Sequence, residues 1–151
     1  MSTVNKTLNE ISVSYSKKNF YNEKIITSLN LHELIRKIYS SSECIIDFKE
    51  YFFIILLNRN NLVIGYNMLS AGGISGTVVD IRIAFAIALK SLATSMVIVH
   101  NHPSGNLKPS QQDITITKQF KDAGRIMDIA IIDHIIIADS GYFSFADQGM
   151  L

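Results

Sequence analysis

Two histidines and an aspartate lie in one short segment with the residue types and spacing of a metal site. His100 and His102 flank a single residue at the end of an apolar run, and Asp113 follows a loop that contains proline and glycine. Residues two apart in an extended chain point the same way, so both imidazoles can reach one point. Two nitrogens and one carboxylate oxygen suit zinc, which favours four ligands and keeps the fourth position for water in catalytic sites. The segment therefore predicts a zinc site of the catalytic kind.

A zinc ion with an open position lowers the pKa of its bound water toward neutrality and so produces a nucleophile. That chemistry also needs a group that accepts a proton from the water and returns it to the leaving group, and one carboxylate can do both. Glu50 is the candidate, because it stands directly before an apolar run that reads as a core strand. A charged residue in that position is unremarkable by itself, so its role rests on what else the site contains.

Ser110 has two interpretations that the sequence leaves open. Its hydroxyl could donate to the oxyanion that forms when water attacks a carbonyl group. The pattern Ser110-x-x-Asp113 also resembles a helix capping box, with Asp in place of the usual Glu. We do not expect one hydroxyl to serve both roles at full strength.

The histidines have structural alternatives as well. His100 and His102 could simply be exposed in a polar loop, and an isolated His-x-His pair is weak evidence for a metal. His134 follows Asp133 and could be proposed as a fourth ligand. It lies at the junction of two apolar stretches, so we favour a hydrogen-bonded histidine within the sheet.

The elements that must position these residues follow from the hydrophobic periodicity and the turn signals. Residues 1–28 are polar and mixed, which indicates an irregular or extended arm with one strand near 11–15. The predicted helices are 29–39, 79–92 and 110–123. The predicted strands are 51–57, 62–69, 96–99, 126–132, 134–138 and 142–145, the first two forming a hairpin. This order predicts one α/β domain with a sheet and helices in layers.

Local signals predict where these elements begin and end. Asn30 is placed to cap the first helix, and Gly124 lies where the third helix would end. Residues 101–109 hold both prolines and must form a loop, and 71–76 reads as a flexible connector. The helix 79–92 is apolar on most sides, so we expect it to be well buried.

The composition sets limits on the class of protein. With 151 residues, 48% hydrophobic and 18% charged, the chain is long and apolar enough for one folded domain. A net charge of +1 does not favour a nucleic-acid partner. The single cysteine excludes an intramolecular disulfide and a thiolate-rich structural zinc site. Without a long apolar run or a stretch like a signal peptide, we expect no membrane association and a cytoplasmic location.

The segment from His100 to Asp113 resembles the JAMM motif, which consists of an upstream Glu, His-x-His, seven residues and Ser-x-x-Asp. Residues 103–109 are the seven residues between His-x-His and Ser-x-x-Asp. Further stretches narrow the resemblance to the RadC-like branch of the JAB/MPN metalloprotease superfamily, from about Phe48 to the C-terminus. These stretches are Gly76-Thr77-Val78-Val79-Asp80, Ile132-Asp133-His134-Ile135-Ile136-Ile137 and Tyr142-Phe143-Ser144-Phe145.

The resemblance implies a fold and a set of roles. The fold is a single-domain JAB/MPN fold over residues 29–151, a mixed β-sheet flanked by helices in a layout related to cytidine deaminases. The metal is Zn²⁺ on His100, His102 and Asp113, with Ser110 supporting the oxyanion and Glu50 as the base. A deaminase itself is disfavoured, because it needs a pair of cysteines and the chain has one.

The resemblance also implies a function. Characterised JAMM proteins are metallopeptidases, notably isopeptidases that remove ubiquitin-like tags, so a peptide or protein substrate is expected. One alternative is a non-catalytic MPN-type interaction module, and another is a DNA-repair-associated protein. Longer RadC-like members carry an N-terminal domain of the helix-hairpin-helix type, which we expect to be missing here, and DNA binding is therefore not favoured.

Overall fold

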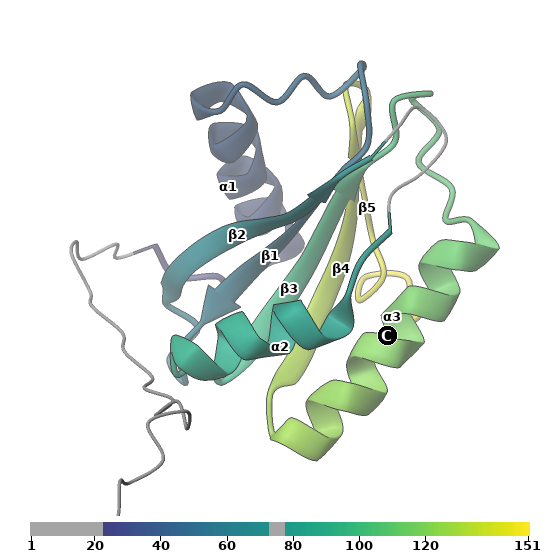
Figure 1. Ribbon diagram of the computed structural model, residues 1–151. Helices are drawn as coiled ribbons and strands as arrows, with labels where there is room; N and C mark the ends of the chain where they lie inside the picture. Colours follow the sequence, from purple (N-terminus) through teal and green to yellow (C-terminus); the bar gives the residue numbers. More distant parts are fainter. Residues whose placement is uncertain (1–22, 73–77) are drawn as a thin grey trace, which may run out of the picture.

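A five-stranded sheet forms the centre of the protein, with α1 on one face and α2 and α3 on the other (Figure 1). The computed structural model describes residues 23–72 and 78–151. The helices are α1 (Ser28–Ser41), α2 (Ile81–Lys90) and α3 (Gln111–Met127). The strands are β1 (Tyr51–Leu57), β2 (Val63–Ala71), β3 (Ser95–Asn101), β4 (Ala130–Ala138) and β5 (Gly141–Ser144). The predicted α/β domain with a mixed sheet flanked by helices is confirmed.

The strands lie in the order β2-β1-β3-β4-β5. Strands β3 and β4 run parallel, while β1 pairs antiparallel with β2 and β3, and β4 pairs antiparallel with β5. The parallel pair is joined through α3, which packs on β4. The polypeptide thus leaves the carboxyl end of β3, crosses in α3 and returns in β4, and ligand sites in α/β proteins lie at that end of the strands.

Two hydrophobic cores lie on opposite faces of the sheet because successive side chains of a strand alternate between them. Phe53 and Ile55 of β1 belong to the core under α1, whereas Phe52 and Ile54 belong to the core under α2 and α3. The same alternation continues along β3. At the end of this strand it places His100 and Asn101 on different faces of the sheet.

Strand β4 contains a bulge at the point where the sequence predicted two strands. Met96 of β3 pairs with Ile131, but the next residue of β3 pairs with Asp133, so Ile132 is the extra residue. A one-residue shift moves all later side chains to the other face. Ile131 and His134 therefore both face α3, although three positions separate them. The prediction of separate strands 126–132 and 134–138 is wrong, because one bulged strand spans the junction.

Helix α3 extends beyond its predicted end at Gly124. The glycine lies inside the helix, and a Cβ atom there would lie 2.4 Å from the carbonyl oxygen of Ile129. The backbone N–H of Ile129 donates to the carbonyl oxygen of Gly124 at 2.9 Å. The missing side chain thus allows close packing rather than a helix end. The helix ends instead at Asp128, which has a positive φ of 55°.

The first helix begins earlier than the sequence indicated. Thr27 is the N-cap residue, and its hydroxyl accepts from the backbone N–H of Asn30 at 3.2 Å. Asn30 completes the capping box from within the first turn, since its side chain accepts from the N–H of Thr27. The prediction that Asn30 is the cap is therefore wrong by three positions. Ile25, just before this cap, is buried in the core under α1.

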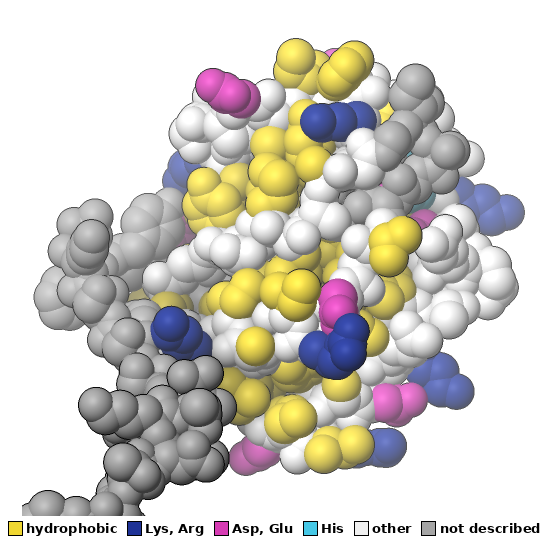
Figure 2. Space-filling model, in the orientation of Figure 1, with side chains coloured by type: hydrophobic (Ala, Val, Ile, Leu, Met, Phe, Trp, Pro, Cys, Tyr) yellow, Lys and Arg dark blue, Asp and Glu magenta, His cyan; other side chains and the backbone are white. Residues whose placement is uncertain are grey.

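Helix α2 is buried on one side only, contrary to the prediction for 79–92. Asp80 caps the helix, and Ala84, Phe85 and Ala88 pack into the core. On the outer side, however, Ile83 is 54% exposed and Leu89 is 47% exposed. The space-filling view shows hydrophobic side chains on this face of the molecule (Figure 2).

Some predicted features lie outside the described residues. The strand expected near 11–15 is among them, as are 73–76 of the predicted connector, whereas Ala71 belongs to β2. Within the part of the chain that is described, no helix is both long and apolar enough to cross a membrane.

Candidate metal centre

His100 and His102 point to the same side of the sheet, at the carboxyl end of β3. His100 is the sixth residue of the seven in this strand and is only 1% exposed, with its ring stacked on Phe52 at 5.9 Å. His102 follows the strand, and its backbone N–H still donates to Ile137 of β4 at 3.0 Å. This bond continues the extended pairing, so the alternation that the sequence predicted brings the two imidazoles together.

Asp113 approaches the histidines from the first turn of α3. Ser110 is the N-cap of this helix, and its hydroxyl accepts from the backbone N–H of Asp113 at 3.1 Å. The Asp113 carboxylate in turn accepts from the backbone N–H of Ser110 at 2.7 Å. The capping box is therefore present, as one interpretation of the sequence predicted. It fixes one Asp113 oxygen and orients the carboxylate toward the end of β3.

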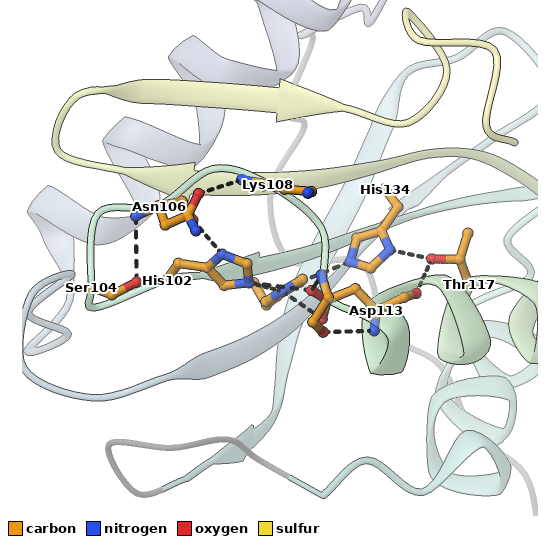
Figure 3. A network of polar contacts seen from close by, with 9 residues as sticks. His102, Ser104, Asn106, Lys108, Asp113, Thr117 and His134 are labelled. Atoms are coloured by element: carbon orange, nitrogen blue, oxygen red, sulfur yellow. Dashed lines mark hydrogen bonds and ion pairs between the residues drawn. The ribbon is translucent and has the colours of Figure 1, made fainter.

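The two imidazoles and the Asp113 carboxylate meet at one place, where one ligand atom from each residue lies within 4.8 Å of the others. His100 Nε2 lies 3.0 Å from His102 Nε2 and 3.1 Å from Asp113 Oδ1. His102 Nε2 lies 3.3 Å from Asp113 Oδ2. Figure 3 shows His102 and Asp113 pointing toward one another from the loop and from the helix. Among the described residues, this is the group of His, Cys, Asp and Glu side chains whose ligand atoms could hold one metal ion.

The hydrogen bond at Nδ1 of His102 leaves Nε2 as the nitrogen that can bind a metal. His102 Nδ1 lies 2.5 Å from the backbone carbonyl oxygen of Asn106 (Figure 3). A carbonyl only accepts, so Nδ1 carries the hydrogen and, in a neutral ring, Nε2 presents a lone pair. This lone pair faces the Asp113 carboxylate, which also only accepts. A proton or a metal cation must lie between them to make the contact favourable.

The electrostatics of the site show the same demand for a positive charge. Burial alone would raise the pKa of Asp113, but hydrogen bonds with His100 and His102 outweigh it and hold that pKa well below its usual range. Burial would lower the pKa of His102, yet the bonds to Asp113 and Asn106 outweigh it and raise that pKa. In the metal-free protein, a proton on His102 thus takes the place that a cation would fill.

Glu50 opens into the same cavity as His102 and Asp113. It directly precedes β1 and is half-buried, and it lines a cavity of about 490 Å³ together with His102, Ser110 and Asp113. Burial raises the pKa of Glu50 and the Asp113 carboxylate raises it further, while His100 and His102 act in the opposite direction. The sequence-based candidate therefore lies where a proton acceptor with a raised pKa could serve the metal site.

Asn101 is a residue of the site that the sequence reasoning missed. It lies between the two histidines in the chain and faces the opposite side of the sheet, where its side chain is 0% exposed. Its carboxamide donates to the carbonyls of Ile46 and Lys49 at 2.7 and 2.9 Å, and accepts from Tyr51 N–H and Tyr39 O–H at 2.8 and 2.9 Å. Two of these partners flank Glu50. Asn101 therefore ties the backbone around Glu50 to the histidine segment.

The hydroxyl of Ser110 keeps its hydrogen available despite the cap. A hydroxyl has one hydrogen to donate and two lone pairs. The cap uses a lone pair, because Ser110 Oγ accepts from Asp113 N–H. The cap and a donor role therefore use different parts of the hydroxyl group, and Ser110 lines the cavity from this capped position.

His134 is a hydrogen-bonded histidine within the sheet, as predicted. Its Nε2 lies 2.8 Å from Nδ1 of His100, so it contacts the side of His100 that faces away from the candidate metal. Its Nδ1 lies 2.5 Å from the hydroxyl of Thr117 on α3. Burial, with a smaller contribution from His100, lowers the pKa of His134 well below its usual value. Thr117 was not predicted, because a threonine on a helix carries no signal of its own.

The rest of the cavity wall is mixed in character. Phe52, Val79 and Ile116 give it an apolar part, and Lys108 and Gln112 give it a polar part. Ligand pockets in proteins commonly combine an apolar wall with a few polar groups that fix the orientation of the ligand.

Comparison with known proteins identifies the family. The sequence model of the family described as the RadC-like JAB domain matches residues 26–150 of this chain. Curated relatives include UPF0758 proteins from Flavobacterium johnsoniae (50% identical over 101 residues), Pelobacter propionicus (44% over 103) and Porphyromonas gingivalis (41% over 104). These matches cover 67–68% of this chain but only 44–46% of each relative, so the chain spans less than half of their length. The chain belongs to the family of RadC-like JAB domains.

Proposed function

We propose that this chain is a zinc-dependent hydrolase that uses a zinc-bound water to cleave a peptide or isopeptide bond. The observation that carries the proposal is the convergence of His100, His102 and Asp113 at the wall of a cavity that also contains Glu50. An interaction surface alone has no need for a buried set of metal ligands with a carboxylate beside it.

The spacing of the ligand atoms supports zinc as the metal. Zinc binds imidazole nitrogen at about 2.0–2.1 Å, and tetrahedral angles then place neighbouring ligand atoms about 3.3 Å apart. In this site the two Nε2 atoms are 3.0 Å apart, and His100 and His102 lie 3.1 and 3.3 Å from the two different oxygens of the Asp113 carboxylate, which is near that spacing. Two nitrogens and one oxygen also leave a fourth position for water, as in catalytic zinc sites. When bound, zinc supplies a Lewis acid that brings the pKa of its water near neutrality.

The protein's own residues would carry the proton and charge transfers. Glu50 would take a proton from the attacking water and return it to the leaving nitrogen as the carbon–nitrogen bond breaks, so that protons balance. The raised pKa of Glu50 suits a group that must both accept and release a proton near neutrality. Ser110 would donate its hydroxyl hydrogen to the oxyanion of the substrate carbonyl.

The proposed partner is a peptide or a protein, in the cytoplasm. The mixed wall of the cavity suits a polypeptide segment, whereas a net charge of +1 over the chain gives no electrostatic reason to favour nucleic acid. Association with DNA repair is therefore a weaker proposal. Salt-sensitive binding to DNA would support it.

Glu50→Gln is the variant that tests the proposed activity. The amide keeps the size of the side chain but cannot accept the proton from water, so zinc should be retained while hydrolysis is lost. The assay uses a panel of peptides and lysine-linked isopeptide conjugates, with zinc content measured on the same samples. Equal hydrolysis by wild type and variant would contradict the role of Glu50. A wild type that holds zinc and cleaves none of the panel would favour an interaction module.

A further inference from the structure

A line of buried hydrogen bonds runs behind the candidate metal ligands and connects two of them. It begins at the backbone carbonyl of Asp113, which accepts from the hydroxyl of Thr117 at 2.6 Å. The same hydroxyl lies 2.5 Å from Nδ1 of His134, and Nε2 of His134 lies 2.8 Å from Nδ1 of His100. Figure 3 shows Thr117 and His134 on the side of Asp113 away from His102. The line therefore starts at one metal ligand and ends at another.

The donors and acceptors along this line allow one arrangement. The carbonyl of Asp113 can only accept, so the single hydroxyl hydrogen of Thr117 is donated to it. The oxygen of Thr117 must then accept from Nδ1–H of His134. A neutral imidazole has one N–H, so Nε2 of His134 accepts, and Nδ1 of His100 carries the hydrogen that is donated to it.

The surroundings of His134 favour the neutral ring that this arrangement requires. The side chain is 0% exposed, and its ring stacks on Phe145 with centroids 4.6 Å apart. Within the described residues, the polar contacts of the ring are with Thr117 and His100, and neither is a carboxylate. A buried charge without an opposite charge in contact is costly, so the ring stays neutral.

We propose that Thr117 and His134 are positioning residues that fix His100 in the tautomer with hydrogen on Nδ1. The lone pair on Nε2 of His100 then faces His102 and Asp113, where a metal needs it. The inference rests on the proposed function only in taking zinc as the metal, since the tautomer belongs to the metal-free protein.

The tautomer itself is the first readout. Long-range ¹H–¹⁵N correlation spectra of the ¹⁵N-labelled, metal-free protein distinguish the two ring nitrogens of each histidine. At a pH where the imidazoles are neutral, we expect hydrogen on Nδ1 of both His100 and His134. Hydrogen on Nε2 of His100 would overturn the proposal.

Thr117→Val is the variant that breaks the line with the least change in shape. It removes the acceptor for Nδ1–H of His134, so both tautomers of His134 and His100 should become populated. Zinc affinity, measured by competition with a chromophoric chelator, should fall about 10–100-fold, as is typical when a hydrogen-bond partner of a metal ligand is removed. Thr117→Ser keeps the hydroxyl and should restore both the tautomer and the affinity.

Thr115→Val is the matched control. Thr115 lies on the same helix, and its hydroxyl also donates to the carbonyl four residues earlier, at 2.9 Å, but it contacts no histidine in the described structure. Its affinity for zinc should equal that of wild type. If Thr117→Val behaves like Thr115→Val in both readouts, the proposal is wrong.

The two readouts separate this inference from the proposed function. A wild-type protein that binds no zinc contradicts the zinc site, but its spectra still show which nitrogen of His100 carries hydrogen. A Thr117→Val protein that fails to fold leaves the wild-type spectra and the Thr117→Ser affinity as the deciding results.

Discussion

The candidate metal ligands face one another in a way that makes protons and metal compete for the same place. Nε2 of His102 lies 3.3 Å from an Asp113 oxygen, and Nδ1 of the same ring is committed to the carbonyl of Asn106. Without a metal, a proton must occupy the gap. The acid–base behaviour of these residues therefore sets how metal binding depends on pH.

Zinc affinity should fall as the pH falls, beginning above the ordinary histidine pKa of 6.5. The pKa of His102 is raised above 6.5 in the metal-free protein, so the ring holds its proton to a higher pH than a free imidazole. Zinc needs the neutral ring, and its binding must displace that proton. Asp113, whose pKa is well below its usual range, stays ionised throughout. Chelator competition between about pH 5 and 8 measures the affinity, and an affinity that does not change with pH would contradict the assignment.

Ser110 allows its structural and chemical roles to be separated. Ser110→Ala removes the cap and should destabilise the protein by about 1 kcal/mol. Ser110→Asn supplies another cap acceptor but no hydroxyl, so it should keep most of the stability and lose about 100–1000-fold in hydrolysis. Thermal unfolding of the metal-free protein and turnover of a cleaved substrate measure the two effects. Full activity of Ser110→Asn would exclude the oxyanion role.

At the scale of the elements, Asn101 joins the end of β3 to the segment that enters β1. Its four hydrogen bonds satisfy all the capacity of the carboxamide, and the side chain is completely buried. The histidines beside it face α3, while Asn101 faces α1. One strand end therefore holds the candidate metal ligands on one face and fixes the backbone around Glu50 from the other.

Asn101→Ala should destabilise the protein by at least about 1–3 kcal/mol, because it leaves buried backbone groups without partners. It should also lower hydrolysis more than zinc binding, since Glu50 loses its support while the histidines keep theirs. Asn67→Ala, at an exposed position of β2, is the control and should be near neutral. Denaturant unfolding measures both proteins, and a stability equal to that of the control would contradict the role of Asn101.

Gly124→Ala sets helix propensity against packing. Alanine would favour the helix by about 1 kcal/mol, but its Cβ would lie 2.4 Å from the backbone carbonyl oxygen of Ile129. A backbone atom cannot move aside cheaply, so we expect a net loss of about 1–3 kcal/mol. Gly65→Ala, with no atom within 4 Å of the added Cβ, is the control. A higher melting temperature for Gly124→Ala would show that the turn after α3 can relax.

The sequence predicted the parts of the site that depend on local geometry. Alternation along β3 places His100 and His102 on one side, and the capping box places Asp113 in the first turn of α3. It did not predict the bulge at Ile132, because a bulge depends on which strand lies alongside. The direction of His134 follows from that bulge.

The partners of Asn101 were unpredictable for a related reason. They come from α1, from the loop before β1 and from β1 itself, at separations of 50 to 62 residues. A single asparagine in an apolar strand does not indicate which distant backbone groups it will satisfy. The end of α3 was missed because a glycine can either end a helix or permit close packing, and the choice depends on Ile129.

At the scale of the whole molecule, the site lies where both faces of the sheet contribute. Helix α3 supplies Asp113 and Thr117 from one face, and the core under α1 supports Glu50 through Asn101 from the other. The parallel strands β3 and β4 lie beneath the candidate site, and the two histidines lie at the carboxyl end of β3. Because a metal would bind the folded arrangement and not the unfolded chain, zinc should stabilise the protein as a whole.

The central claim is that His100, His102 and Asp113 bind one zinc ion. The most direct measurement is the zinc content of protein purified without added metal and then titrated with zinc, by inductively coupled plasma mass spectrometry. We expect one zinc per chain in the wild type and a loss of zinc in His100→Ala and Asp113→Ala. A wild-type protein that contains no zinc and takes up none on titration, or variants that bind it equally well, would contradict the claim.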